Sequence, residues 1–160
     1  MKMWLAAVLA LALGAPAEAA GITRHKGSPD APILMGAGVP PGATITVLSG
    51  QVAPVFDKDA PPDSPRAYGD TKTQTIGVLN RIRVALEGMG LSMGDVVKMT
   101  VFLVGDPATG GKMDFKGFSD GYAQFFGTAN QPNIVARSTM QVAALVNPGW
   151  LVEIEVIAAK

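Results

Sequence analysis

The fold is decided by Ala136-Arg137-Ser138-Thr139-Met140-Gln141-Val142 and Val152-Glu153-Ile154-Glu155-Val156-Ile157-Ala158, two segments near the C-terminal end of the chain. Both are short and typical of strands, yet each carries charge inside the run. An arginine set among apolar residues can hold a carboxylate through two parallel hydrogen bonds. A glutamate close by can hold or activate a water molecule. Together the two segments contain the minimum side chains for hydrolysis of a small acid.

Strand alternation gives each segment two different faces. In the first segment a polar face is predicted to oppose a mostly apolar one, with Val135, Arg137, Thr139 and Gln141 against Ala136, Ser138, Met140 and Val142. In the second segment the two glutamates are predicted to share a face, with Glu153 and Glu155 opposite Val152, Ile154 and Val156.

Each charged residue also has a purely structural interpretation. Arg137 can lie on a solvent face or in a salt bridge between subunits, and Glu153 can belong to a solvated strand face. If the two strands form a hairpin around Asn147-Pro148-Gly149, Arg137 and Glu153 would be neighbours and a simple ion pair would explain both. The sequence alone leaves these alternatives open.

The first 20 residues have the pattern of a signal peptide. Met1-Lys2-Met3 is basic, residues 4–13 are an apolar run, and Ala17-Glu18-Ala19 places small residues as a signal peptidase requires. The run is too short to span a bilayer, which needs about 20 apolar residues. An uncleaved anchor or a buried N-terminal helix is the alternative. We expect cleavage, a single domain over residues 21–160, a periplasmic or secreted location, and no membrane association afterwards.

Composition excludes several classes of function. The chain has no cysteine, and His25 is its one histidine, which excludes thiol catalysis and argues against a zinc site or a Ser-His-Asp triad. Thirteen basic residues balance thirteen acidic ones, so no electrostatic footprint for nucleic acid is predicted. The combination of 48% hydrophobic and 16% charged residues indicates extensive burial and hints at an oligomer.

The remaining pattern predicts an α+β domain. Strands are predicted over 43–52, 96–104, 134–145 and 151–159, helices over 71–90 and 113–126, and loops over 21–42 and 53–70. Asp70 or Thr71 can cap the first helix. The two helices are expected on one face of a mixed sheet, and a symmetric partner would cover the other face. Residues 96–104 are almost continuously apolar, which predicts a central strand.

Two further segments are weaker candidates for a site. Ser49-Gly50-Gln51 ends the strand over 43–52 and can form a bulge that offers backbone N–H groups to a substrate oxygen. Tyr122 lies on the aromatic face of the second helix, which residue spacing alone assigns to the core.

Several motifs, in order along the chain, resemble the RidA/YjgF family of reactive-intermediate imine/enamine deaminases. They cover about two thirds of the chain and are Gln74-Thr75 with Asn80, Gly90-Leu91-Ser92, Asp95 to Leu103, Tyr122-Ala123-Gln124-Phe125-Phe126, Ala136-Arg137-Ser138 and Val152 to Ala158.

The resemblance implies a chorismate-mutase-like fold and a homotrimer in which the sheets form a central barrel with sites between subunits. It implies cofactor-independent hydrolysis of 2-imino or enamine acids, such as 2-iminobutanoate or 2-iminopropanoate, to 2-oxo acids and ammonia. By resemblance Arg137 holds the substrate carboxylate, Glu153 positions water, and Ser49 and Gly50 line the pocket. A carboxylate-binding trimer without turnover is the alternative function.

Three positions depart from the family pattern. Met35 stands in an N-terminal loop that often carries an aromatic residue, and Ser119 replaces a frequent asparagine on the second helix. Pro132 lies five residues before Arg137, where the family proline usually lies two residues before the arginine. We include Met35, Ser119 and Tyr122 among the pocket residues, and no metal ligand is predicted.

Overall fold

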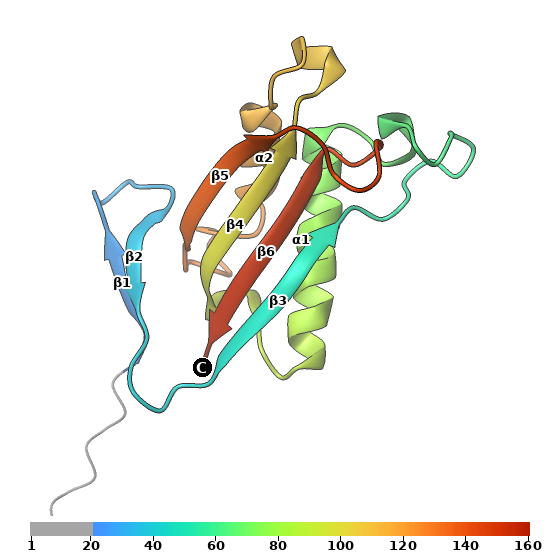
Figure 1. The fold of residues 1–160 in the computed structure, drawn as a ribbon. Helices are drawn as coiled ribbons and strands as arrows, with labels where there is room; N and C mark the ends of the chain where they lie inside the picture. The colour runs from blue at the N-terminus through green and yellow to red at the C-terminus, as the bar shows by residue number, and fades with distance from the viewer. Residues whose placement is uncertain (1–20) are drawn as a thin grey trace, which may run out of the picture.

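A computed structural model describes residues 21–160 as a six-stranded mixed sheet with two helices on one face (Figure 1). The predicted signal peptide over residues 1–20 lies outside the described residues. The strands are β1 (Thr23–Lys26), β2 (Leu34–Gly38), β3 (Ile45–Val52), β4 (Val96–Val104), β5 (Ala136–Val142) and β6 (Val152–Ala159), and the helices are α1 (Thr71–Gly88) and α2 (Phe115–Tyr122). Short 3-10 helices occupy Pro65–Ala67, Met93–Asp95 and Pro107–Thr109. The predicted α+β class and the helix-covered sheet are confirmed.

The strand order is β1-β2-β5-β4-β6-β3, which separates β5 from β6. The C-terminal hairpin that the sequence left open as an alternative is therefore not formed. β4 and β5 are parallel and joined through α2, whereas α1 connects β3 to β4 and leaves a gap of one strand between them. β6 fills this gap antiparallel to both neighbours. Filling the gap satisfies the backbone of β6 on both edges, which a hairpin with β5 alone would not do.

β4 lies in the middle of the sheet, as its apolar run predicts. Met99, Val101 and Leu103 are fully buried beneath the helices, and the alternate residues are only partly covered in the single chain. The core on the helix-covered face is completed by residues from both helices and from β6, namely Val78, Leu79, Ile82, Leu86, Phe118, Tyr122, Val152, Ile154 and Val156.

The start of α1 is fixed by two polar side chains. Asp70 is the cap, because its carboxylate accepts a hydrogen bond from the Thr73 N–H at 2.8 Å. Gln74 is fully buried and binds three backbone groups: its amide donates to the Gly69 and Gly149 carbonyls at 3.0 Å each and accepts from the Leu151 N–H at 2.8 Å. The family motif residue Gln74 thus ties the helix to the segment that enters β6.

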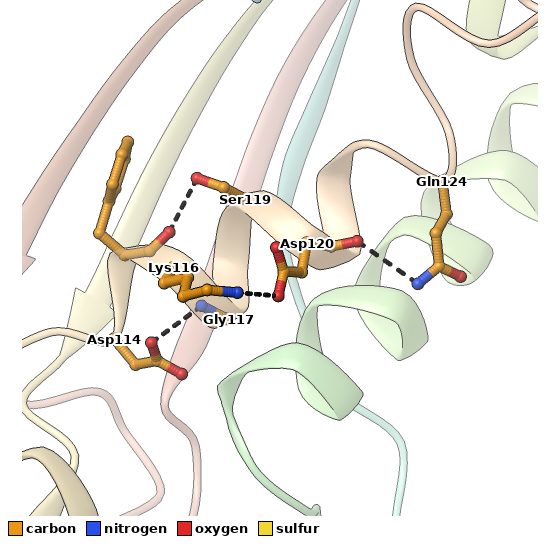
Figure 2. A network of polar contacts seen from close by, with 7 residues as sticks. Asp114, Lys116, Gly117, Ser119, Asp120 and Gln124 are labelled. Atoms are coloured by element: carbon orange, nitrogen blue, oxygen red, sulfur yellow. Dashed lines mark hydrogen bonds and ion pairs between the residues drawn. The ribbon is translucent and has the colours of Figure 1, made fainter.

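Replacing Gln74 with leucine is expected to lower the free energy of unfolding by about 2–4 kcal/mol, because three buried backbone groups lose their partner. Chemical denaturation would measure this loss. Gln124→Leu is the matched control, since Gln124 is exposed and makes one hydrogen bond of 3.4 Å to the Asp120 carbonyl (Figure 2). Equal stability of the two variants would contradict the role given to Gln74.

The Asp70 cap is expected to make stability sensitive to acid. The hydrogen bond from the Thr73 N–H holds the pKa of Asp70 below its usual value. The stabilisation is therefore fully present above the unfolded pKa of about 3.9 and is lost as the pH falls through the lower folded pKa. Asp70→Asn keeps a capping side chain that does not titrate, so its stability should change less from about pH 5 to pH 2. Thermal unfolding across this range would test it, with the exposed Asp63→Asn variant expected to follow the wild-type profile.

The N-terminal hairpin of β1 and β2 is the element that the loop prediction over 21–42 misses. It stands apart from the rest of the sheet and joins β5 through the pairing of Leu34 with Ala136 (Figure 1). Arg24 fastens it, because its guanidinium donates to the carbonyls of Val96, Ile134 and Gly94 at 2.7–3.0 Å. Burial lowers the pKa of Arg24. The strand pairing depends on this long-range clamp, which local sequence does not indicate.

The face of the sheet opposite the helices is open in the single chain. It carries exposed apolar side chains, including Ile45, Val47 and Met140. Within residues 21–160, no helix has the length and apolar character needed to cross a bilayer.

Candidate functional site

Arg137 points toward the helices. It is paired with Met99 in the register of β4 and β5, and Thr139 is paired with Val101. Paired residues point to the same side of a sheet, and both partners are fully buried in the core beneath the helices. The predicted alternation along β5 is correct, but its polar face is the helix-covered one. Alternation separates the faces without indicating which of them a helix will cover.

The guanidinium of Arg137 lies over a row of aromatic rings on α2. Its Cζ atom is 4.4 Å from the ring centroid of Tyr122, 4.8 Å from that of Phe118 and 5.9 Å from that of Phe115. Tyr122 in turn stacks on Phe126 with centroids 4.9 Å apart. The ring faces attract the cation and hold its plane in place.

No carboxylate neutralises Arg137 in the described chain. The ion pairs found within residues 21–160 are Arg66–Asp57, Arg83–Glu87 and Lys116–Asp120. The Nη1 atom of Arg137 is buried and has no hydrogen-bond partner. Burial lowers the pKa of this guanidinium, and burial raises the pKa of the neighbouring Tyr122 phenol. An arginine remains charged in spite of such a shift, so the site holds an unpaired cation that an anion would satisfy.

A cavity of about 570 Å³ opens beside Arg137. Its wall includes the predicted pocket residues Ser119 and Tyr122, and its rim is the β1–β2 hairpin. The Ser119 hydroxyl donates to the Phe115 carbonyl at 2.8 Å, as Figure 2 shows. The structure therefore brings Arg137, Ser119 and Tyr122 together in one cavity.

Glu153 lies on the opposite face of the same sheet. It pairs with Phe102 of β4, which alternates with the buried Val101 and Leu103. The predicted shared face of Glu153 and Glu155 is confirmed, since Val152, Ile154 and Val156 are all buried on the other side. The ion pair between Arg137 and Glu153 that a hairpin would allow is excluded within one chain.

Gly50 and Ser49 lie in the part of the molecule that contains Glu153 and do not line the cavity beside Arg137. The register of β3 against β6 shifts between Leu48 and Gln51, which confirms the predicted bulge. A Cβ atom on Gly50 would collide with the Glu153 carboxylate, so glycine lets that carboxylate lie against the bulge. Ser49 lines a separate hollow of about 280 Å³ on the open face together with Lys98 and Glu155.

Met35 belongs neither to the residues around Arg137 nor to those around Glu153. Its side chain is 79% exposed on β2 and does not line the cavity beside Arg137. The neighbouring Leu34 is the buried residue of this strand. The hairpin contributes to the cavity through Lys26 and the turn over 29–32 instead of through Met35.

Sequence reasoning missed several residues around Arg137. Phe115 and Phe118 form part of its aromatic bed, and Thr139 places a buried hydroxyl without a partner two residues further along the same side of β5. A signal for the aromatic residues was available in the sequence. Aromatic side chains are spaced three to four residues apart on α2, and an arginine lies on the adjoining strand. Lys26 and the turn over 29–32 had no local signal, because the hairpin itself was not predicted.

The arrangement places an unpaired cation beside a cavity on the helix-covered face of the sheet, and the Glu153 carboxylate at the β3 bulge on the other face. Within residues 21–160, no group of three or more His, Asp or Glu side chains is placed to hold a metal ion. The two groups lie on opposite faces of one sheet, so both can act on one ligand only if two chains meet.

Comparisons with known proteins support the motifs. A RutC family protein of Pyrococcus horikoshii is 38% identical over 92 residues, which make up 58% of this chain and 64% of that protein. The match thus spans less than two thirds of the length of this relative. TdcF of Escherichia coli, whose name assigns it provisionally to the reactive intermediate deaminases, is 33% identical over 99 residues, or 62% of this chain and 70% of that protein.

Solved structures share the fold. The structure of Escherichia coli TdcF with bound serine has a TM-score of 0.55 at 30% identity and covers 81% of this chain and 89% of that chain. An uncharacterised protein of Pseudomonas aeruginosa has a TM-score of 0.55 at 25% identity and covers 87% of this chain and 98% of that chain. The family described as Endoribonuclease L-PSP matches residues 39–160. With this fold and these motifs, the chain belongs to the Endoribonuclease L-PSP family, the RidA/YjgF family that the sequence resembles.

Proposed function

We propose that this chain hydrolyses 2-imino and enamine acids to 2-oxo acids and ammonia without a metal or organic cofactor. The observation that carries the proposal is the buried Nη1 of Arg137, a cation with no anion, held over aromatic rings beside a cavity. A planar carboxylate fits the guanidinium through two parallel hydrogen bonds. The provisional deaminase name of TdcF supports the reaction class.

The reaction requires little beyond orientation. Arg137 would hold the substrate carboxylate so that the adjoining C=N carbon faces a water held by Glu153. The water oxygen bonds to that carbon, and one water proton passes to the Glu153 carboxylate. Glu153 returns this proton to nitrogen, which gives a tetrahedral carbinolamine. The hydroxyl proton of that intermediate then passes through Glu153 to nitrogen, the C–N bond breaks with its electron pair on nitrogen, and ammonia leaves while the C–O bond becomes the carbonyl of the 2-oxo acid. An enamine first takes a proton on carbon and becomes the imine. Fixing the reactants at this distance is the main contribution of the protein.

A homotrimer is part of the proposal. Arg137 and Glu153 face opposite sides of one sheet, so a partner would have to bring its Glu153 half to the cavity of the first chain. The exposed apolar side chains of the open face, such as Val47 and Met140, favour a covered surface there. Closed cyclic symmetry gives every chain the same contacts and completes every site.

Export is proposed on the N-terminal pattern alone. The basic start, the short apolar run and the small residues before residue 20 favour cleavage and a periplasmic or secreted protein. Determining the N-terminal residue of the mature protein after expression in a Gram-negative host would test it, with an intact Met1 as the contrary result.

A carboxylate-binding trimer without turnover is the second candidate. This function is favoured by the separation of Arg137 and Glu153 on opposite faces of the sheet, since Arg137 can bind an acid without Glu153. The deciding experiment generates 2-imino acids in situ with an amino-acid oxidase and measures 2-oxo acid formation with the purified protein and with buffer. A rate above buffer supports the deaminase. Thermal stabilisation by carboxylates without product would support the binder.

A further inference from the structure

In the single chain, the cavity beside Arg137 is larger than a short acid requires. It measures about 570 Å³. A three-carbon imino acid would fill at most roughly 180 Å³ of it, if each heavy atom is given the roughly 30 Å³ that a water molecule takes in the liquid. A ligand with an aromatic or branched side chain would occupy the space far better, and cavities for such ligands have volumes of this order.

The cavity wall is predominantly apolar. Beyond Arg137 its apolar surface comes from the end of α2, the connector to β5 and the hairpin turn, namely Phe115, Tyr122, Ala123, Phe126, Pro132, Ile134, Pro29, Ala31 and Pro32. Phe115 is 45% exposed, although its ring adjoins the guanidinium. An apolar surface of this kind gains by contact with an apolar ligand group.

The polar groups on the wall are few, and two of them are already engaged. The Ser119 hydroxyl donates to the Phe115 carbonyl at 2.8 Å, and the Lys26 ammonium contacts the Pro29 carbonyl at 3.4 Å. Lys26 and Asp30 carry opposite charges on the hairpin and add no net charge to the rim. Two buried atoms on the wall of the described cavity lack a hydrogen-bond partner, Arg137 Nη1 and the Tyr122 hydroxyl, and only Arg137 is charged. Arg137 is therefore the anchor for a carboxylate, and most of the rest of a ligand would meet apolar groups.

The hairpin turn precedes residue 39, where the family match begins, so the family pattern does not determine its chemistry. Arg24 nevertheless fixes the hairpin to the carbonyls of Val96, Ile134 and Gly94. The apolar rim is thus a clamped part of this fold, and its composition belongs to this chain.

We propose that the cavity selects carboxylates with a bulky apolar side chain, of the size found in leucine or phenylalanine, over short-chain acids. As a statement about substrates it rests on the proposed deaminase function. It makes 2-imino acids derived from large apolar amino acids the preferred substrates. Ala123 is the specificity-determining position, because this small residue lines the cavity just beyond α2 and is exposed.

The test compares binding of two stable carboxylates, 3-phenylpropanoate and propanoate, to the full protein by isothermal titration. The wild type is expected to bind 3-phenylpropanoate at least about tenfold more tightly, because the longer ligand buries several additional carbon atoms. Ala123→Phe would fill the space and reduce the ratio to about one, because the longer ligand loses its apolar contacts. Ala129→Phe adds the same ring at an exposed alanine outside the cavity and should keep the wild-type ratio.

Equal affinity of the two acids for the wild type, or an unchanged ratio in Ala123→Phe with the fold intact, would overturn the proposal. The binding experiment does not depend on turnover. A tenfold preference with no 2-oxo acid formed from any imine would defeat the deaminase function alone and leave the selectivity for bulky carboxylates standing. Turnover of small and large imines at equal rates, with equal binding, would defeat the selectivity alone.

Discussion

Arg137→Ala is expected to lower kcat/KM for 2-imino acids by about 100- to 10,000-fold. The variant removes two charge-assisted hydrogen bonds to the substrate carboxylate, each contributing about 1.5–3 kcal/mol. The guanidinium is already held over the Tyr122 and Phe118 rings, so its binding geometry exists before the ligand arrives. Initial rates of 2-oxo acid formation would measure the loss.

The stability of the same variant separates the functional interpretation from the structural one. Arg137 has a buried Nη1 without a partner, so removing it relieves an uncompensated charge as well as removing ring contacts. Thermal unfolding should therefore change little while activity collapses. Arg137→Lys should retain part of the activity, because lysine keeps the charge without the planar fork. Arg66→Ala, at a 74% exposed side chain, is the matched control and should behave as wild type. Full activity in Arg137→Ala would remove the basis of the proposed function.

Glu153→Gln is expected to lower kcat by about 100-fold or more with a small change in KM, because the amide holds water but cannot take its proton. A larger change in activity is expected when the two inactive variants are mixed. When equal amounts of Arg137→Ala and Glu153→Gln chains are unfolded and refolded together, some sites should combine an intact Arg137 from one chain with an intact Glu153 from its neighbour. In a randomly mixed cyclic trimer about a quarter of the sites meet this condition. Activity near a quarter of wild type should return from two inactive preparations.

The control mixture pairs Arg137→Ala with the double variant that also carries Glu153→Gln. It contains no Arg137 and should stay inactive after the same treatment. Recovery in the first mixture alone would demonstrate a site shared between chains. Persistent inactivity there, with oligomers confirmed by size, would argue that Glu153 does not act together with the Arg137 of a neighbour.

The sequence predicted some elements closely because their signals are local. Residues 96–104 are almost continuously apolar, and β4 has those bounds. α1 begins after a residue that can cap it and ends near glycine, and it is found over Thr71–Gly88. The hairpin of β1 and β2 pairs a short polar strand with a short strand that contains two glycines, and Arg24 fastens it to carbonyls more than 60 residues away, so no local pattern indicates it.

The sequence indicated individual residues of the candidate site but not how they are arranged on the sheet. Charge within apolar strands singled out Arg137 and Glu153, and only the family resemblance suggested their roles. Their separation depends on β6 entering between β4 and β3, and this pairing follows from the one-strand gap left by α1. The aromatic bed of Arg137 depends on which face of β5 the helix α2 covers, and alternation alone cannot decide that.

The insertion of β6 also determines when the molecule can acquire its cooperative structure. β3 and β4 have no direct ladder with each other, and β6 joins them through residues 152–159. A nascent chain that has not yet reached this segment has two open strand edges and an unclosed apolar interior, however well α1 and α2 have formed. Such a chain lacks both strand ladders that β6 makes and remains an open substrate for chaperones or proteases. Loss of the β6 segment should therefore abolish folding as a whole instead of trimming one edge of the sheet.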